Sequence, residues 1–278
     1  MDITTPVQFN EKDLMYLREM ILTRSGIVLE SDKDYLLQAR LDPVAKEHGF
    51  SDMGELSAYL KKTPSDPLHQ QVVEAMTTNE TSFFRDFGPF EALKEHVLPN
   101  IIEHRGTSKT LMMWCGAASS GQEPYTISMV LRDHFPQLLD WNVKFLATDL
   151  SKKMLDKCRQ GKYSQLEVNR GLPAQLLIKY FEKKGMSWVV KDDLRNMIEF
   201  KEMNLTGTWP LLQKMDIVFL RNVLIYFGVS MKKEILEKVR ETLQPYGYLF
   251  LGGAETTLNI DDHFERVPFN NTSCYRLK

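Results

Sequence analysis

The sequence contains little cysteine and no hydrophobic stretch long enough for a membrane-spanning helix. Its 278 residues include three cysteines, which are widely spaced and form neither a C-x-x-C pair nor a pattern with histidine. Such a set argues against a disulfide framework and against a structural zinc site. No run approaches ~18 apolar residues, and the first residues include an early acid but no apolar signal core. We therefore expect a cytoplasmic protein with reduced thiols, no metal and no direct membrane insertion.

The sequence also lacks an excess of positive charge. Lysine and arginine total 35 and aspartate and glutamate total 37, which gives a formal net charge of −2. A domain that neutralises many phosphates carries a basic excess, so nucleic acid is not expected as a partner. Repeats and low-complexity tracts are absent, and the 43% hydrophobic content is that of a globular chain with one or two domains.

The first 76 residues predict a small all-helical domain. Asn10 is a suitable N-cap for the first helix, Gly26 a suitable stop, and Pro67 fits the first turn of the last helix. Apolar residues recur at helical spacing in four segments: 10–26, 31–49, 51–62 and 66–76.

After residue 90, short apolar runs alternate with helical stretches. This alternation is typical of βα units, so we expect an α/β domain with a doubly wound, mostly parallel sheet. Two extended segments near the end, 263–269 and 272–277, are joined by Asn270-Asn271 and predict an antiparallel hairpin. The expected strands are 110–115, 144–148, 216–220 and 248–252, and the expected helices are 90–104, 122–135, 151–159 and 230–243.

The βα alternation is interrupted between residues 162 and 204. Ser187–Val190 and Met197–Lys201 have the composition of short strands, and the polar residues 191–193 lie between them. We therefore expect a small inserted hairpin at about residues 185–202.

A loop of small residues follows the first predicted strand. Residues 116–124 read GAASSGQEP and contain neither G-x-x-x-x-G-K-[ST] nor G-x-G-x-x-G, so a nucleoside triphosphate or a dinucleotide is poorly supported. Glu123 at the helix start would also repel phosphate. Glu123, together with Asp149 at the end of the next strand, suits a ligand that carries hydroxyls and positive charge, as S-adenosylmethionine does. Alternatively, the loop is only a strand-to-helix connection, and Asp149 caps the helix that starts near Ser151.

Six segments, taken in order, resemble the bacterial chemotaxis receptor methyltransferases, the CheR family. They span nearly the whole chain, and the R-N-V-x-I-Y-F pattern is the most distinctive. The segments are TTNETSFFRD (77–86), WCGAASSGQEPY (114–125), ATDLS (147–151) with MNL (203–205), FLRNVLIYF (219–227) and GYLFLGGAE (247–255).

The resemblance implies a class I methyltransferase-type sheet with a small inserted antiparallel β subdomain, preceded by the all-helical domain. It implies a helical domain at 1–76, a linker and cofactor-contacting segment at 77–89, and a catalytic domain at 90–278. The implied activity is methylation of specific glutamates of chemoreceptors with S-adenosylmethionine, giving glutamate methyl esters and S-adenosylhomocysteine for sensory adaptation. The enzyme would act in the cytoplasm, recruited to membrane receptor arrays.

The resemblance also implies the residues of the site. Arg85 and Tyr226 would serve catalysis, and Leu205 would contact the adenine through its backbone. Taken outside their motifs, Arg85 suits a surface ion pair and Tyr226 suits packing, while Phe83, Phe84 and Trp114 are expected in the core. The residues implied around the cofactor are Asn79, Thr81, Arg85, Glu123, Asp149, Asn204, Leu205, Arg221 and Asn222.

Two features depart from the family pattern. The family's helical domain is thought to meet the receptor's methylation helices through a basic face, but residues 1–76 hold eight basic and thirteen acidic residues. The segment 183–188 also lacks the longer Gly- and Pro-bearing loop of members that bind a receptor's C-terminal tether, so we expect recognition without a tether. Two alternatives stay open: a cofactor-binding regulatory or scaffold protein, and a methyltransferase of another substrate.

Overall fold

The computed structural model describes residues 10–278 and divides them into two compact units. One unit comprises the chain up to Thr78 together with Tyr226–Gly228, and the other comprises Asn79–Ile225 and Val229–Lys278. Each unit has its own buried apolar residues.

The first unit is helical, as the sequence predicts. Asn10 accepts a hydrogen bond from the backbone of Lys12, and Gly26 ends the first helix in the left-handed conformation at φ 73°. Pro67 takes the N-cap position of the last helix rather than its first turn. The helices are α1 (Glu11–Ser25), α2 (Asp34–Glu47), α3 (Met53–Lys62) and α4 (Leu68–Met76), and their fully buried side chains include Leu17, Ile21, Leu37, Leu41, Leu56 and Val72.

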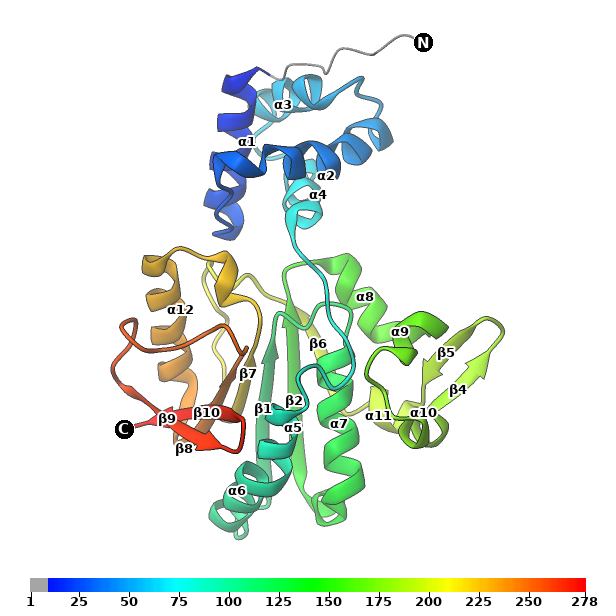
Figure 1. The fold of residues 1–278 in the computed structure, drawn as a ribbon, viewed down its shortest axis with the longest axis vertical. Helices are drawn as coiled ribbons and strands as arrows, with labels where there is room; N and C mark the ends of the chain where they lie inside the picture. The colour runs from blue at the N-terminus through cyan, green and yellow to red at the C-terminus, as the bar shows by residue number, and fades with distance from the viewer. Residues whose placement is uncertain (1–9) are drawn as a thin grey trace. The chain divides into compact units, whose positions relative to one another are not determined.

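The second unit contains a seven-stranded sheet within the described residues, in the order β6-β2-β1-β7-β8-β10-β9 (Figure 1). Five strands run parallel, and the β9–β10 hairpin adds two antiparallel strands at one edge, so the predicted fold class is confirmed. The strands are β1 (Thr110–Gly116), β2 (Asn142–Asp149), β6 (Ile198–Glu202), β7 (Met215–Leu220), β8 (Leu243–Leu251), β9 (Phe264–Phe269) and β10 (Thr272–Leu277).

The connections place helices on both faces of this sheet. α7 (Gln122–His134) leads from β1 to β2, whereas α12 (Val229–Thr242) leads from β7 to β8. Because these right-handed crossovers run in opposite directions along the sheet, α7 and α12 cover opposite faces. The remaining helices are α5 (Gly88–Ala92), a π-helical turn at Leu93–Val97, α6 (Leu98–Arg105), α8 (Lys152–Gln160), α9 (Gln165–Asn169), α10 (Ala174–Tyr180) and α11 (Asp192–Arg195).

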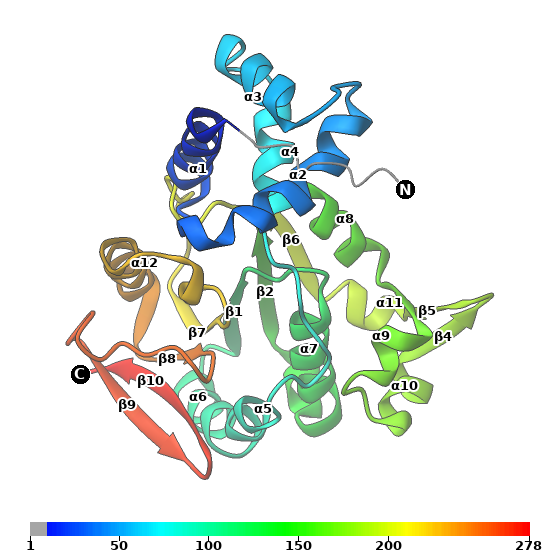
Figure 2. The same ribbon diagram turned by 45° about the horizontal axis from the view of Figure 1, so that its top comes forward.

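The predicted hairpin at 185–202 is wrong. The small antiparallel sheet has the order β3-β5-β4, formed by Lys162–Ser164, Ser187–Val190 and Phe181–Lys184. It lies beside α9, α10 and α11, and Figure 2 shows β4 and β5 projecting from the main sheet. The second expected strand is β6, which pairs in parallel with β2 instead. A long-range partner therefore overrides the local hairpin pattern.

The direction of chain progression reverses between β1 and β7. From β1 the chain proceeds to β2 on one side, and from β7 it proceeds to β8 on the other side. Doubly wound sheets bind ligands outside the carboxyl ends of their strands at such a point. The fold therefore directs attention to the residues that follow β1, β2, β6 and β7.

Candidate functional site

Six of the predicted site residues lie at the carboxyl edge of the main sheet. Because these strands are parallel, their ends share one edge. Glu123 lies in the first turn of α7 after the β1 loop, Asp149 ends β2, Asn204 and Leu205 follow β6, and Arg221 and Asn222 follow β7.

The loop after β1 is held in a conformation that few side chains adopt. Ala117 and Ser119 have positive φ angles of 56° and 51°, and Gly121 has a φ of 94°. A Cβ at Gly121 would lie 2.9 Å from the Tyr163 hydroxyl and 3.0 Å from the Cys158 sulfur. Packing inside the domain thus explains this glycine.

Asp149 fixes this loop against the end of β2. Its Oδ2 accepts a hydrogen bond from the backbone N–H of Ser119 at 2.7 Å, and its Oδ1 accepts one from Ser151 at 2.9 Å. The α8 N-cap is Ser151, whose hydroxyl accepts from Met154. Asp149 is therefore not the cap itself. It is buried, with 7% exposure, and a carboxylate has further acceptor positions for hydroxyl groups.

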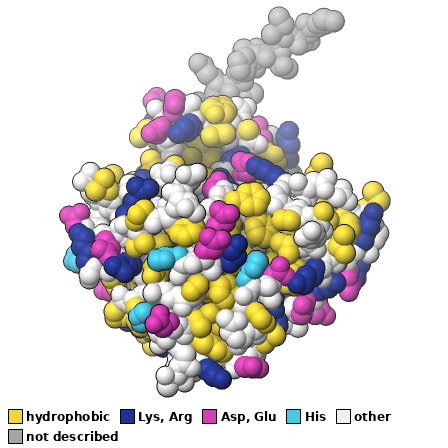
Figure 3. Space-filling model, turned by 60° about the horizontal axis from the view of Figure 1, so that its bottom comes forward, with side chains coloured by type: hydrophobic (Ala, Val, Ile, Leu, Met, Phe, Trp, Pro, Cys, Tyr) yellow, Lys and Arg dark blue, Asp and Glu magenta, His cyan; other side chains and the backbone are white. Residues whose placement is uncertain are grey.

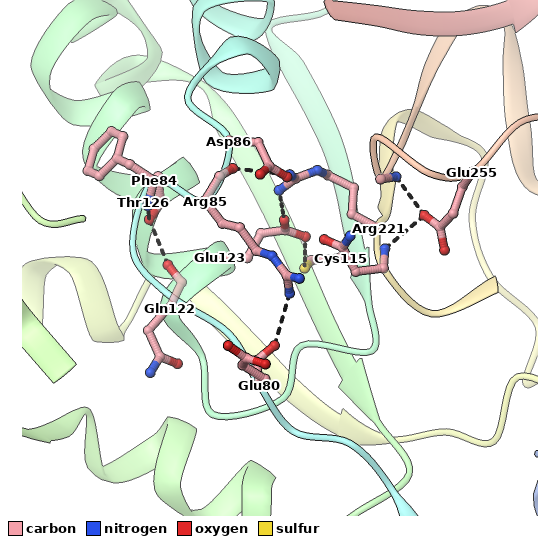
Figure 4. Close-up of polar contacts among 12 residues, drawn as sticks. Glu80, Phe84, Arg85, Asp86, Cys115, Gln122, Glu123, Thr126, Arg221 and Glu255 are labelled. Carbon is pink, nitrogen blue, oxygen red and sulfur yellow. Dashed lines mark hydrogen bonds and ion pairs between the residues drawn. The ribbon is translucent and has the colours of Figure 1, made fainter. Parts of the chain in front are cut away.

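Arg221 joins the first turn of α7 to the segment that precedes α5. Its guanidinium forms ion pairs with Glu123 and with Asp86, and its Nη2 also donates to the Arg85 carbonyl at 3.1 Å (Figure 4). The side chain is 1% exposed and lies over the Phe90 ring. Glu123 is thus paired rather than isolated, which lowers the cost of burying its charge.

Residues 79–87 are anchored to the β1 loop and to α7. The Asn79 carbonyl accepts from the Ser119 hydroxyl at 2.9 Å, and the Phe84 N–H donates to the Thr126 hydroxyl at 3.1 Å. Phe83 is fully buried and Phe84 nearly so, as predicted. The half-buried Arg85 donates to the Glu80 carbonyl at 3.0 Å. Half-buried Thr81 lies in the same segment.

Asn204 and Leu205 form a turn after β6. The Asn204 Oδ1 accepts hydrogen bonds from the backbone N–H and the hydroxyl of Thr206, at 3.0 and 2.9 Å. The Leu205 carbonyl accepts from the Trp209 indole at 2.9 Å. That indole packs edge-on against the fully buried Trp114, which is in the core as predicted.

Tyr226 belongs to the other unit. It ends the short helical turn Leu224–Tyr226, is half-buried, and its carbonyl accepts from the Val28 N–H at 3.1 Å. The structure therefore brings Glu123, Arg221 and the Arg85 backbone together. Tyr226 is described with the helical unit.

Sequence reasoning assigned no role to two carboxylates of this region. Asp86 pairs with Arg221, and Glu255 accepts backbone hydrogen bonds from the loop after β7. Both lie in segments that carry the family resemblance, but no local signal identifies their partners after β7, which are 30 to 135 positions away in the chain.

On the face shown in Figure 3, basic and acidic side chains are interspersed rather than gathered into a basic tract. Within residues 10–278, no cluster of three or more His, Cys, Asp or Glu side chains could hold a metal ion. None of the helices in this part of the chain combines the length and the apolar character needed to cross a membrane.

Comparison with known proteins identifies both parts of the chain. Residues 12–77 match the model of the CheR methyltransferase all-alpha domain, and residues 79–272 match that of the CheR methyltransferase SAM-binding domain. The chain is 42% identical to the chemotaxis protein methyltransferase Cher2 of Pseudomonas putida, over 96% of this chain and 98% of that protein. It is 36% identical to chemotaxis protein methyltransferase 1 of Vibrio cholerae, over 99% of this chain and all of that protein.

The groups at the sheet edge fit the cofactor of this family. S-adenosylmethionine carries ribose hydroxyls, an ammonium and a carboxylate. Asp149 and Glu123 supply acceptors, and the buried Nε of Arg221 is a donor that has no hydrogen-bond partner in the described protein. S-adenosylmethionine is the cofactor, and the chain belongs to the CheR family of chemotaxis methyltransferases.

Proposed function

We propose that this protein methylates specific glutamate side chains of chemoreceptors, giving glutamate methyl esters and S-adenosylhomocysteine for sensory adaptation. It would act in the cytoplasm, at membrane receptor arrays. The alternatives are a regulatory or scaffold protein that binds the cofactor, and a methyltransferase with another substrate.

The observation that carries this proposal is the extent of the match. The relatives named as chemotaxis methyltransferases align with the helical unit as well as with the cofactor domain. The predicted cofactor contacts all lie outside residues 1–76, so a conserved architecture that includes those helices suggests a role in substrate recognition. We propose domain limits of 1–76 and 90–278, with 77–89 as the connecting segment that also contacts the cofactor.

Within the cofactor site, each proposed contact has a chemical reason. Asp149 would accept hydrogen bonds from the ribose hydroxyls, and Glu123 would face the ammonium group. Because the Leu205 carbonyl already accepts from Trp209, its N–H is the backbone group that we propose for the adenine. The remaining proposed contacts are Asn79, Thr81, Arg85, Asn204, Arg221 and Asn222.

The transfer step requires orientation rather than a base. The cofactor supplies an electrophilic methyl group on sulfur, and a glutamate with a pKa of about 4.3 is already ionised near neutrality. The protein must therefore align the two reactants and exclude water. Arg85 would hold a carboxylate through its fork of donors, and Tyr226 would donate one hydrogen bond near the transfer site.

A base-release assay tests the reaction class. The protein is incubated with methyl-labelled S-adenosylmethionine and membranes that carry chemoreceptors, and the product is then treated with base. Label released as volatile methanol would support a carboxyl methyl ester. Base-stable label would exclude it, and absence of transfer despite cofactor binding would favour the regulatory alternative.

The two catalytic assignments predict a loss of turnover. We expect Arg85→Ala and Tyr226→Phe to lower kcat by at least tenfold, because each removes a directed hydrogen bond to reacting groups. Cofactor affinity, measured by calorimetry, should change much less in Tyr226→Phe. Arg276→Ala is a control, since Arg276 forms an exposed pair with Glu265 on the terminal hairpin. Normal turnover in either test variant would remove that residue from the mechanism.

A further inference from the structure

Glu255 receives an unusual number of backbone hydrogen bonds. It follows β8, is 8% exposed, and is not part of any ion pair within residues 10–278. Its Oε2 accepts from the N–H groups of Asn222 at 2.8 Å and Gly252 at 2.6 Å, and its Oε1 accepts from those of Val223 at 2.8 Å and Ile225 at 3.3 Å. Main-chain dipoles therefore balance this buried charge.

These bonds determine the path of the loop after β7. Asn222 has a φ of 58°, in the left-handed region, and lies directly after the buried Arg221. Its N–H lies beyond Leu220, where the pairing of β7 with β8 ends, and the Glu255 carboxylate supplies the acceptor that this backbone group needs. Figure 4 shows the Glu255 carboxylate with dashed lines from one of its oxygens to backbone N–H groups.

The same loop is confined from the β8 side. A Cβ at Gly252 would lie 2.6 Å from the Asn222 Nδ2 and 2.7 Å from the Glu255 Oε2. The Asn222 side chain is therefore packed against the turn that carries the carboxylate. A displacement of Glu255 would move both the backbone and the amide of Asn222.

We infer that Glu255 is a positioning residue of the cofactor site, which holds the Asn222–Ile225 loop so that Asn222 is presented to S-adenosylmethionine. This inference rests on the cofactor role proposed for Asn222. It does not depend on which substrate accepts the methyl group.

The substitution Glu255→Gln tests it with little change in size. One glutamine oxygen can serve two of the four N–H groups, but the amide nitrogen is a donor and leaves the other two without an acceptor. We expect the dissociation constant of S-adenosylhomocysteine, measured by calorimetry, to rise at least tenfold. Glu237→Gln, at a half-exposed position on α12, should bind as the unaltered protein does. Unchanged affinity in Glu255→Gln would overturn the inference.

A double-mutant cycle tests whether Glu255 acts through the loop. If it does, adding Glu255→Gln to Asn222→Ala should weaken binding by less than threefold, because the presented amide is already absent. Full additivity would overturn the inference, as would unchanged affinity in Asn222→Ala. A general loss of stability would instead weaken binding to the same extent in both backgrounds.

Hydrogen exchange in the unaltered protein gives a test that does not depend on any variant folding. We expect slow exchange at the N–H groups of Asn222, Val223 and Ile225. Asn222 and Val223 lie outside helices and strands, and Ile225 lies in the short turn Leu224–Tyr226. Exchange at the rate of an open loop would overturn the inference. Normal cofactor binding with no receptor methylation would refute the proposed function alone and leave this inference standing.

Discussion

At the scale of single residues, the site contains an almost completely buried charge, that of Arg221. Its side chain is 1% exposed and is paired with Glu123, which is 14% exposed. Removal of one partner from a buried pair leaves the other charge without compensation and typically costs about 3–5 kcal/mol. We expect Arg221→Ala to lower the free energy of unfolding by about that amount in urea titrations. Arg276→Ala, which breaks an exposed pair, should cost less than about 1 kcal/mol, and equal costs would contradict the prediction.

The three thiols are predicted to be unreactive in the native protein. Burial raises the pKa of Cys115, and the nearby Glu123 adds to this; burial also raises the pKa of Cys158, and that of Cys274 to about 11. Little thiolate therefore forms at pH 8, and an aromatic disulfide reagent should label the three thiols only after unfolding in urea.

Because unfolded thiols lose protons from about pH 8.5, the free energy of unfolding should fall as the pH rises above that value. Fast labelling of any of the three thiols in the native protein would contradict the prediction that they are unreactive.

At the scale of elements, Gly171 lies between α9 and α10 and packs closely against the segment 79–87. A Cβ at Gly171 would lie 2.0 Å from the Phe83 carbonyl oxygen, and its φ is 87°. Gly171→Ala should therefore displace this segment and lower the melting temperature by more than the backbone strain alone explains. Gly185→Ala is the matched control, because Gly185 has a φ of 61° but open space around it. Equal melting temperatures for the two variants would contradict the prediction.

Periodicity predicted most elements, but it did not predict all of their partners. Helices such as α1 and α8 begin at a side-chain N-cap and end at a left-handed glycine, so their spans follow from local sequence. β3 and β4 were missed because they are only three and four residues long and mostly polar. The partner of β6 was wrong because strand pairing depends on residues far away in the chain.

The same limit applies to the site. Residues after strand ends could be located, because parallel strands bring their carboxyl ends to one edge. The partners of Arg221 and Glu255 could not, because their contacts join separate loops across this edge. Local pattern thus indicates where a site lies, whereas the network that holds it requires the folded structure.

At the scale of the whole molecule, the charge of the helical unit would limit how it meets the chemoreceptor that we propose as its substrate. Residues 1–76 hold eight basic and thirteen acidic residues, so long-range attraction to acidic helices is weak. Arg40, one of the basic residues, donates to the Met76 and Thr77 carbonyls and so closes the end of α4. Recognition of a receptor helix by this unit would therefore depend on close contacts more than on steering.

The small antiparallel sheet leads to a prediction about receptor choice. β4 and β5 are joined by only two residues, Gly185 and Met186, so this edge lacks a longer loop that could enclose a peptide. We expect a peptide from a receptor's carboxyl terminus to show no low-micromolar binding in calorimetry. Receptors with and without that terminus should also be methylated at equal rates, since no tether raises the local enzyme concentration. Nanomolar or low-micromolar binding, or a slower rate on the truncated receptor, would show that this sheet holds a tether despite its short turn.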